Sequence, residues 1–282
     1  MGASFDLNLT SGGEGRSTFT MPGTRGRPAV LSDWRVMGGR CLRRSFRNPE
    51  AFFTALMLPI VLMLLFVYVF GGDLRTSGTY VDYVVPGLIV LCAGFGAGTT
   101  AVAVATDMTN GMVDRIRSMP VGASALLVGH VIASLARNLV ATALVIGAGL
   151  AIGWRPSGTA MDWVAATGMI LLFVSALSWL AAGVGLLAGS AEAATSFTML
   201  LMFIPYVSTA FVPARTMPSA LAAFARDQPF TPIIETMRGL WMGSTSTGSS
   251  TGHEALIAVA CCVALLLISA FGASRLFVRR AV

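Results

Sequence analysis

A serine in a hydrolase-like pattern lies near the C-terminal end of this 282-residue chain. Residues 248–252 read Gly-Ser-Ser-Thr-Gly, which matches GxSxG with Ser250 as the nucleophile, and His253 follows at once. Such a nucleophile needs a strand before it and a helix after it. Here the serine lies in a run of Ser, Thr and Gly that is typical of a flexible loop. We therefore interpret the match as accidental and expect no catalytic residue.

Other residues that could catalyse a reaction or bind a metal are scarce. The two histidines, His130 and His253, are far apart, and the four cysteines have no CxxC spacing, so no metal site is indicated. All 19 basic residues are arginine, and the chain therefore lacks the lysine that a P-loop needs. We expect no metal and no cofactor bound by this chain, and we interpret His130 as a hydrogen-bonded packing residue.

The composition is that of a membrane protein. Charged residues make up 11% of the chain and hydrophobic residues 55%, whereas a soluble domain is about a quarter charged. Because helices satisfy their own backbone hydrogen bonds in lipid, the long charge-poor stretches predict an all-α integral membrane protein with six transmembrane helices. These stretches are residues 51–70, 83–106, 121–154, 163–191, 193–214 and 255–274.

The arginines predict the orientation of these spans. With both termini inside, thirteen arginines are cytoplasmic and five are external, as the positive-inside rule requires. We therefore expect a multi-pass protein of the plasma (inner) membrane with both termini in the cytoplasm. The net charge of +6 then reflects topology and anionic lipid, and no nucleic-acid partner is expected.

Arg137 is the only formal charge inside a predicted span. An intramembrane charge is by default a functional hypothesis. The stretch that contains it is longer than a crossing needs, however, so its side chain could instead lie near the inner surface and reach the headgroups. The sequence leaves both alternatives open.

Two segments precede the first span. Residues 1–30 are rich in Gly, Ser, Thr and Arg and predict a disordered cytoplasmic tail. Residues 31–48 predict an amphipathic helix in the inner interface, which either anchors the first span or transmits movement. The residues that represent its apolar and basic faces are Trp34, Phe46, Arg40, Arg43 and Arg44.

A short patterned segment follows the second span. Its methionines and Ile116 recur at three or four residues, as on one face of a helix that ends at Pro120. Asp114, Arg115 and Arg117 lie on the other face. The segment is either a helix that docks into a groove of another protein or a solvated connector.

The region between the fifth and sixth spans is markedly apolar for a connection. Residues 217–226 and 228–240 predict two short helices. In the second, Thr231 is the expected N-cap, Pro232 the first helical residue, and Glu235 pairs with Arg238 at three residues' spacing. Such helices can dip into a membrane only where protein or water satisfies their ends.

With these segments placed, residues 30–282 resemble the membrane subunit of type-2 ABC exporters, the permease family that includes the daunorubicin-resistance transporters. Three segments carry the resemblance: residues 31–48, residues 110–120 and residues 228–239. It implies that residues 49–282 form a six-span permease domain. The family often has glutamates near the cytoplasmic segment, where this chain has Asp107 and Asp114 instead.

The resemblance also implies partners and roles. The chain would form a homo- or heterodimer, and a coupling helix with Asp114, Arg115, Arg117 and Pro120 would contact a separate ABC ATPase subunit that binds ATP and magnesium. The missing lysine agrees with a motor on another polypeptide. The outer segment would form re-entrant helices that close the exit. The residues carried over for that role are Gln228, Pro229, Pro232, Glu235 and Arg238.

The expected function is that of a permease in an ATP-driven exporter, which moves an amphipathic drug or lipid-like substrate out of the cell and serves efflux and antibiotic resistance. A polysaccharide or lipid-linked glycan exporter is the alternative within the family. A membrane-embedded hydrolase and a sensor or scaffold without transport are alternatives of other classes.

Overall fold

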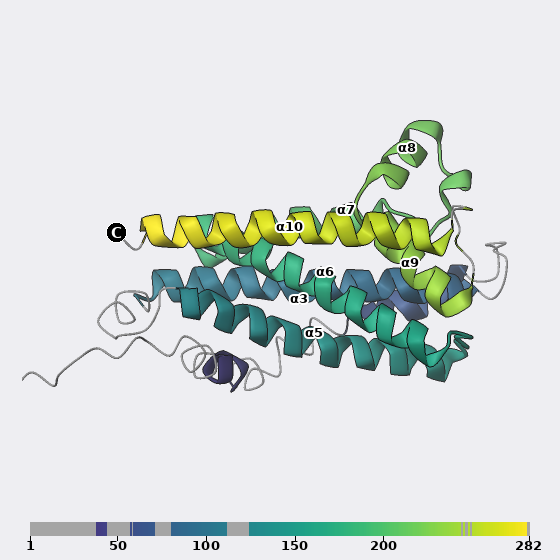
Figure 1. The fold of residues 1–282 in the computed structure, drawn as a ribbon, viewed down its shortest axis with the longest axis horizontal. Coiled ribbons are helices and arrows are strands. Elements are labelled where there is room, and N and C mark those ends of the chain that lie inside the picture. Colours follow the sequence, from purple (N-terminus) through teal and green to yellow (C-terminus); the bar gives the residue numbers. More distant parts are fainter. Residues whose placement is uncertain are drawn as a thin grey trace, which may run out of the picture.

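The structure is a computed structural model that describes residues 38–43, 57, 59–70, 80–111, 124–243, 245, 248 and 250–280. Within these residues the chain forms helices and turns and no strand. Four helices are long and apolar enough to cross a membrane, and they run along the long axis of the molecule (Figure 1). They are α3 (Tyr80–Thr109), α5 (Ser124–Ile152), α6 (Ala160–Leu187) and α10 (Thr251–Arg280).

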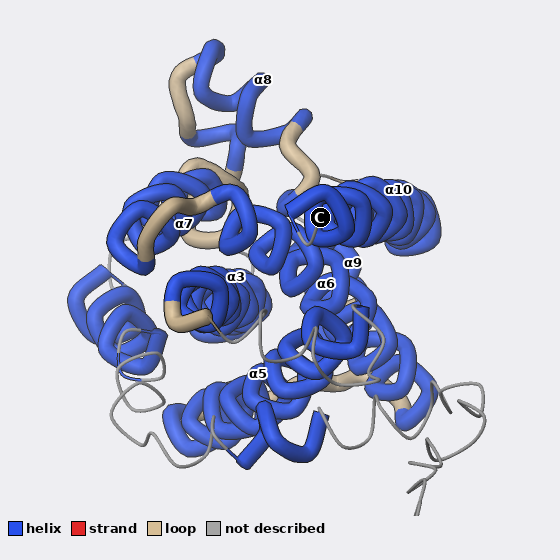
Figure 2. Tube along the Cα trace, turned by 90° about the vertical axis from the view of Figure 1, so that its left-hand side faces the viewer, coloured by secondary structure: helices blue, strands red, loops and turns tan. Residues whose placement is uncertain are grey.

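Helix α3 lies at the centre of the bundle. It packs against α5, α6, α7 and α9, and the view along the long axis shows it surrounded by other helices (Figure 2). In its most apolar stretch 72% of the residues are buried, compared with 17% in α10. Helix α3 therefore supplies more of the core than any other described helix, while α10 presents much of its apolar surface outward.

Local signals set several helix ends. Thr159 caps α6 in a capping box with Asp162, and Gly243 ends α9 in the left-handed conformation with φ of 70°. At the start of α10 the hydroxyl of Ser250 accepts a hydrogen bond from the backbone N–H of His253. Ser250 therefore acts as a helix cap. Since no strand precedes it among the described residues, its GxSxG pattern does not form a nucleophile elbow.

Helix α7 (Ala191–Tyr206) is shorter than the four long helices. Its 16 residues extend about 24 Å, less than the roughly 30 Å of a hydrocarbon core. The stretch 193–214, expected as one span, thus contains α7 followed by a turn. Pro205 lacks an N–H in the last helical turn, and Ser208 donates its hydroxyl hydrogen to the Pro205 carbonyl, which ends the helix there.

The expected first span, residues 51–70, is described only in part. An apolar helix covers Pro59–Val69 and runs into the π-helical turn η1 (Phe66–Phe70), which packs against α3. The described residues thus contain four helices of spanning length.

Three short elements connect α7 to α10: η2 (Ala214–Thr216), α8 (Ser219–Asp227) and α9 (Phe230–Met242). Helix α8 projects from the end of the bundle (Figure 1), and Ala225 is its one buried residue. Helix α9 is buried along most of its length and packs against α3, α6 and α10. The two helices of this connection therefore differ sharply: α8 is exposed, whereas α9 is part of the bundle.

Candidate functional site

The outer segment, residues 214–242, turns into the bundle at the corner between α8 and α9. Gln228 ends α8, and its side-chain amide donates a hydrogen bond to the carbonyl of Val207. Helix α9 begins at Phe230, not at Pro232, and its N-cap is Pro229. Thr231 is therefore not the cap that the sequence predicted.

The hydroxyl of Thr231 has another partner. It donates to the carbonyl of Ala225 in α8, so this threonine connects the two short helices. The N-cap position is occupied by Pro229. The contact joins residues six positions apart across a corner, and the bend of the chain that creates it cannot be derived from local capping rules.

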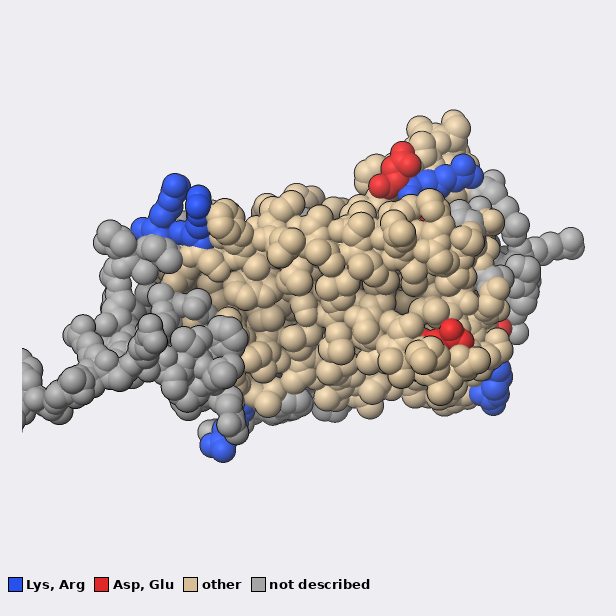
Figure 3. Space-filling model, in the orientation of Figure 1, with Lys and Arg blue, Asp and Glu red and all other residues tan. Residues whose placement is uncertain are grey.

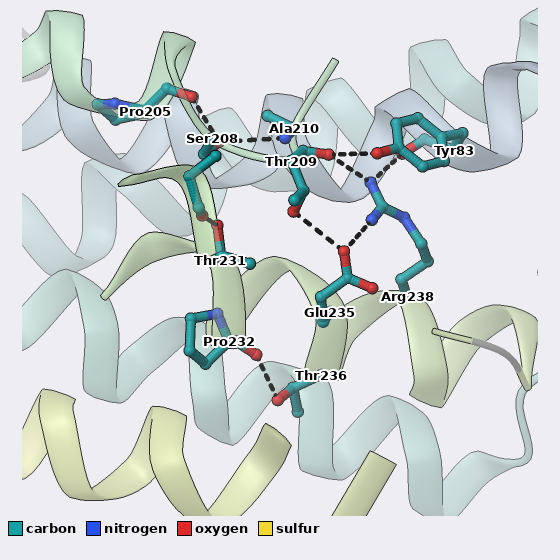
Figure 4. A network of polar contacts seen from close by, with 11 residues as sticks. Tyr83, Pro205, Ser208, Thr209, Ala210, Thr231, Pro232, Glu235, Thr236 and Arg238 are labelled. Carbon is teal, nitrogen blue, oxygen red and sulfur yellow. Dashed lines mark hydrogen bonds and ion pairs between the residues drawn. The ribbon is translucent and has the colours of Figure 1, made fainter. Parts of the chain in front are cut away.

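A buried ion pair anchors α9 (Figure 4). The guanidinium of Arg238 contacts the carboxylate of Glu235, with 2.5 Å between Nη1 and Oε1. The hydroxyl of Thr209 donates to the same carboxylate oxygen at 3.0 Å. Both charged residues are almost completely buried, with exposed fractions of 0% for Glu235 and 4% for Arg238. The i,i+3 pair that the sequence predicted thus exists, inside the bundle.

Arg238 also reaches two other elements. Its Nη2 donates to the carbonyl oxygens of Tyr83 at 2.8 Å and Thr209 at 3.2 Å, and its guanidinium lies 3.7 Å from the centroid of the Tyr83 ring. The hydroxyl of Tyr83 in turn donates to the Thr209 carbonyl at 2.7 Å. One arginine therefore joins α9 to the start of α3 and to the turn after α7.

Sequence reasoning missed Tyr83 and Thr209. Tyr80 contributes in the same way, because its hydroxyl donates to the carbonyl of Phe211. The available signal was the Ser208–Thr209 pair, which interrupts an otherwise apolar stretch. We name the set of Tyr83, Thr209, Glu235 and Arg238 the outer polar network.

Three tryptophans pack together beside this network. The rings of Trp154, Trp163 and Trp241 have centroid separations of 5.2 to 6.1 Å. They come from the connection just after α5, the start of α6 and the end of α9. Trp154 and Trp241 are fully buried, so the cluster packs the end of α9 against the α5–α6 connection.

An apolar cavity of about 210 Å³ lies beneath the α8–α9 corner. Residues of α3, α6, α7 and α10 form its walls, and Pro229 and Phe230 lie at its outer end. Phe230 also packs edge-to-face on Phe173 of α6, with 5.8 Å between ring centroids. The outer segment that the polar network anchors thus also bounds the cavity.

Arg137 lies at the middle of α5, about 20 Å from the helix start at Ser124. Its Nη2 donates to the carbonyl of Gly96 at 2.9 Å and to the hydroxyl of Thr100 at 3.0 Å, both in α3. Because Gly96 is equally far from the C-terminal end of α3 at Thr109, the guanidinium stays at mid-length of the bundle. This geometry favours the intramembrane alternative over a side chain that extends to the surface.

A second polar contact joins α3 and α5 at the opposite end from α9. Nε2 of His130 lies 3.0 Å from Oδ2 of Asp107, and both residues are buried. His130 is thus a hydrogen-bonded packing residue, as the sequence predicted. Among the described residues no cluster of three potential metal ligands occurs.

The remaining predicted site residues are placed only in part. In the helix at residues 38–43, Arg40 and Arg43 are exposed whereas Cys41 is buried, which agrees with an amphipathic segment. The other site residues predicted in segments 31–48 and 110–120 lie outside the described residues. They are Trp34, Arg44, Phe46, Asp114, Arg115, Arg117 and Pro120.

Comparison with known proteins relates this architecture to one family. The family described as ABC-2 type transporter matches residues 32–242. The chain is similar to the daunorubicin resistance ABC transporter permease protein DrrB1 of Streptomyces coeruleorubidus, with 27% identity over 214 residues that cover 75% of this chain and 74% of the relative. It is also similar to the probable doxorubicin resistance ABC transporter permease protein DrrC of Mycobacterium tuberculosis, with 25% identity over 241 residues that cover 81% of this chain and 84% of the relative.

Proposed function

The chain belongs to the ABC-2 type transporter family, and on that premise we propose that it is the permease subunit of an ATP-driven exporter of an amphipathic drug or lipid-like substrate. The relatives named as permeases of daunorubicin and doxorubicin resistance support a drug-type substrate. The observation that carries the proposal is the match of residues 32–242 to this transporter family, on a chain whose described part contains four helices long and apolar enough to cross a membrane.

The proposed topology has six crossings with both termini in the cytoplasm of a cell bounded by the plasma (inner) membrane. The tryptophan cluster puts the start of α6 beside the end of α9, and α10 begins directly after α9. Since α6 ends at the opposite end of the bundle, the chain must return through α7 before α10 can begin. Helix α7, with the turn after it, therefore serves as the fifth crossing, and residues 51–70 serve as the first.

The proposed mechanism alternates between an inward-open and an outward-open arrangement. A separate ABC ATPase subunit would bind ATP and magnesium, and its closure would move the segment that contains Asp114 and Arg115. That segment connects α3 to α5, which the Asp107–His130 contact joins at the same end. A push on the segment would therefore move both helices together.

The hydrogen bonds of the outer polar network would break during this cycle. The network joins α9 to α3 and to the turn after α7, so a displacement of α3 relative to α9 must break at least some of these contacts. In the arrangement described here the network is closed, and we assign it to a state in which the outer exit is sealed. A second permease chain would complete the translocation path.

The test is a double substitution in the coupling segment. Asp114→Ala with Arg115→Ala leaves the net charge unchanged, and it should reduce co-purification with the ABC ATPase subunit and lower coupled export while the chain still inserts. Arg226→Ala with Asp227→Ala is the matched control, because these neighbouring charges are exposed at the far end of the molecule on α8. Equal co-purification and export in both double variants would contradict the coupling assignment.

A further inference from the structure

The apolar cavity opens toward the outside of the bundle. Its floor is formed by buried residues, among them Leu91, Ala97 and Leu177, whereas Leu180, Thr198 and Leu265 on its rim are only partly buried. The rim residues come from α6, α7 and α10. Helices α7 and α10 do not pack along their lengths in the described part of the chain, so the cavity is reached from the side, between these two helices.

The lining selects an occupant without hydrogen-bonding groups. None of the residues around the cavity is charged. Thr198 is its one hydroxyl-bearing residue, and that hydroxyl already donates to the carbonyl of Ala194 at 2.7 Å. A polar ligand would lose its bonds to water and gain none here, which is costly in an apolar site.

The size excludes the bulk of a drug-like molecule. Pockets for such ligands measure roughly 300–1,000 Å³, and this cavity measures about 210 Å³. One unbranched hydrocarbon chain matches both this volume and the apolar lining.

The residues around the opening indicate where such a hydrocarbon chain would come from. The helices on either side of the opening carry large exposed apolar residues, including Leu200 and Phe203 on α7 and Leu267 on α10. In a membrane-spanning bundle such faces meet the hydrocarbon of the bilayer. The opening therefore faces lipid tails.

We propose that this cavity binds one acyl chain of a membrane phospholipid, which enters between α7 and α10 and ends against Phe230 at the first turn of α9. The inference goes beyond the exporter function and does not depend on it. A bound chain would fill the space beneath the α8–α9 corner and give the outer segment a direct contact with the bilayer.

Gly94 provides the test. It lines the cavity, and a Cβ atom built on it meets nothing within 4 Å. Gly94→Leu therefore fills the cavity with a side chain in place of lipid. The matched control is Gly147→Leu, because Gly147 also lies inside a long helix, is exposed, and offers open space to a Cβ atom. Both variants change a helical glycine to leucine, and only one of them changes the cavity.

The probe is a phosphatidylglycerol with a photoreactive diazirine at the middle of one acyl chain, added to the purified chain in detergent. After irradiation and proteolysis, wild type and Gly147→Leu should carry the label on peptides containing Leu180 or Leu265, and Gly94→Leu should lose it. Leu265→Phe narrows the cavity from the α10 side and should also lose the label, so the test survives if one variant misfolds.

Two outcomes would overturn the proposal: absence of the label from these peptides in the wild type, or equal labelling of the folded Gly94→Leu and Gly147→Leu variants. Neither outcome concerns export or ATPase binding. Failure of the lipid site and failure of the exporter function are therefore distinguishable.

Discussion

Glu235 and Arg238 show how two charges can be held inside a largely apolar bundle. Burying an ion pair costs desolvation energy that the pair alone often does not recover. Here Thr209 donates to the carboxylate, and two backbone carbonyls accept from the guanidinium. The charges are therefore stabilised by groups from α3 and from the turn after α7. The same hydrogen bonds hold α9 against these two elements.

Removing one member of the pair should be costly. Glu235→Ala would leave the guanidinium of Arg238 buried without its carboxylate, and loss of one partner from a buried pair costs about 3–5 kcal/mol. We expect a free energy of unfolding lower by that order, measured by denaturant titration of the purified chain in detergent micelles.

Asp227→Ala is the control for that measurement, because it removes an exposed carboxylate from α8. Surface substitutions of this kind usually change stability by less than about 0.5 kcal/mol. Similar stabilities of the Glu235 and Asp227 variants would show that the ion pair does not hold α9 in place.

Glycine spacing acts at the scale of the helices. Two of the chain's GxxxG pairs, Gly94/Gly98 and Gly185/Gly189, each contain one glycine that makes a close approach to another helix. A Cβ atom on Gly98 would lie 2.4 Å from Thr198 of α7, and one on Gly185 would lie 2.4 Å from the Ala101 carbonyl of α3. Their partners Gly94 and Gly189 have open space at the same position. Small residues thus let α3 approach α6 and α7 closely.

Gly185→Ala should therefore separate α6 from α3. The obstacle is a backbone oxygen, which cannot turn aside as a side chain could, and overpacking of this kind costs about 1–3 kcal/mol. The matched control is Gly168→Ala in the same helix, where the added methyl group meets nothing within 4 Å. Thermal unfolding in detergent should show a lower midpoint for Gly185→Ala only, and an unchanged midpoint would refute the close α3–α6 contact.

The long helices and the outer contacts differ in how far the sequence predicts them. Hydrophobic run length is a local property, so stretches that overlap α3, α5, α6 and α10 could be identified from charge spacing alone, although α3 and α10 extend past the charges at both ends of their stretches. The bonds from Arg238 to Tyr83 and from Thr209 to Glu235 join residues 155 and 26 positions apart. No local pattern encodes them, because they exist only once α9 has folded back against α3.

At the scale of the whole molecule, charge marks the two membrane surfaces. The described charged residues on the visible face gather at the two ends of the long axis, with an uncharged band between them (Figure 3). On that face, basic residues alone are seen at one end, while both signs occur at the other. The all-basic end contains the C-terminal part of α10, as expected for the cytoplasmic side.

Labelling of single cysteines tests this orientation. In a background where Cys41, Cys92, Cys261 and Cys262 are replaced by alanine, Ala223→Cys places a thiol on the exposed face of α8 and Val282→Cys places one at the last residue. A membrane-impermeant maleimide should label Ala223→Cys in intact cells and Val282→Cys only after permeabilisation. Because α10 is the one described helix between these positions that is long and apolar enough to cross a membrane, labelling of both in intact cells would mean that α10 does not span the membrane. Labelling of Val282→Cys alone would mean that the arginine bias predicts the wrong orientation and that the outer polar network faces the cytoplasm.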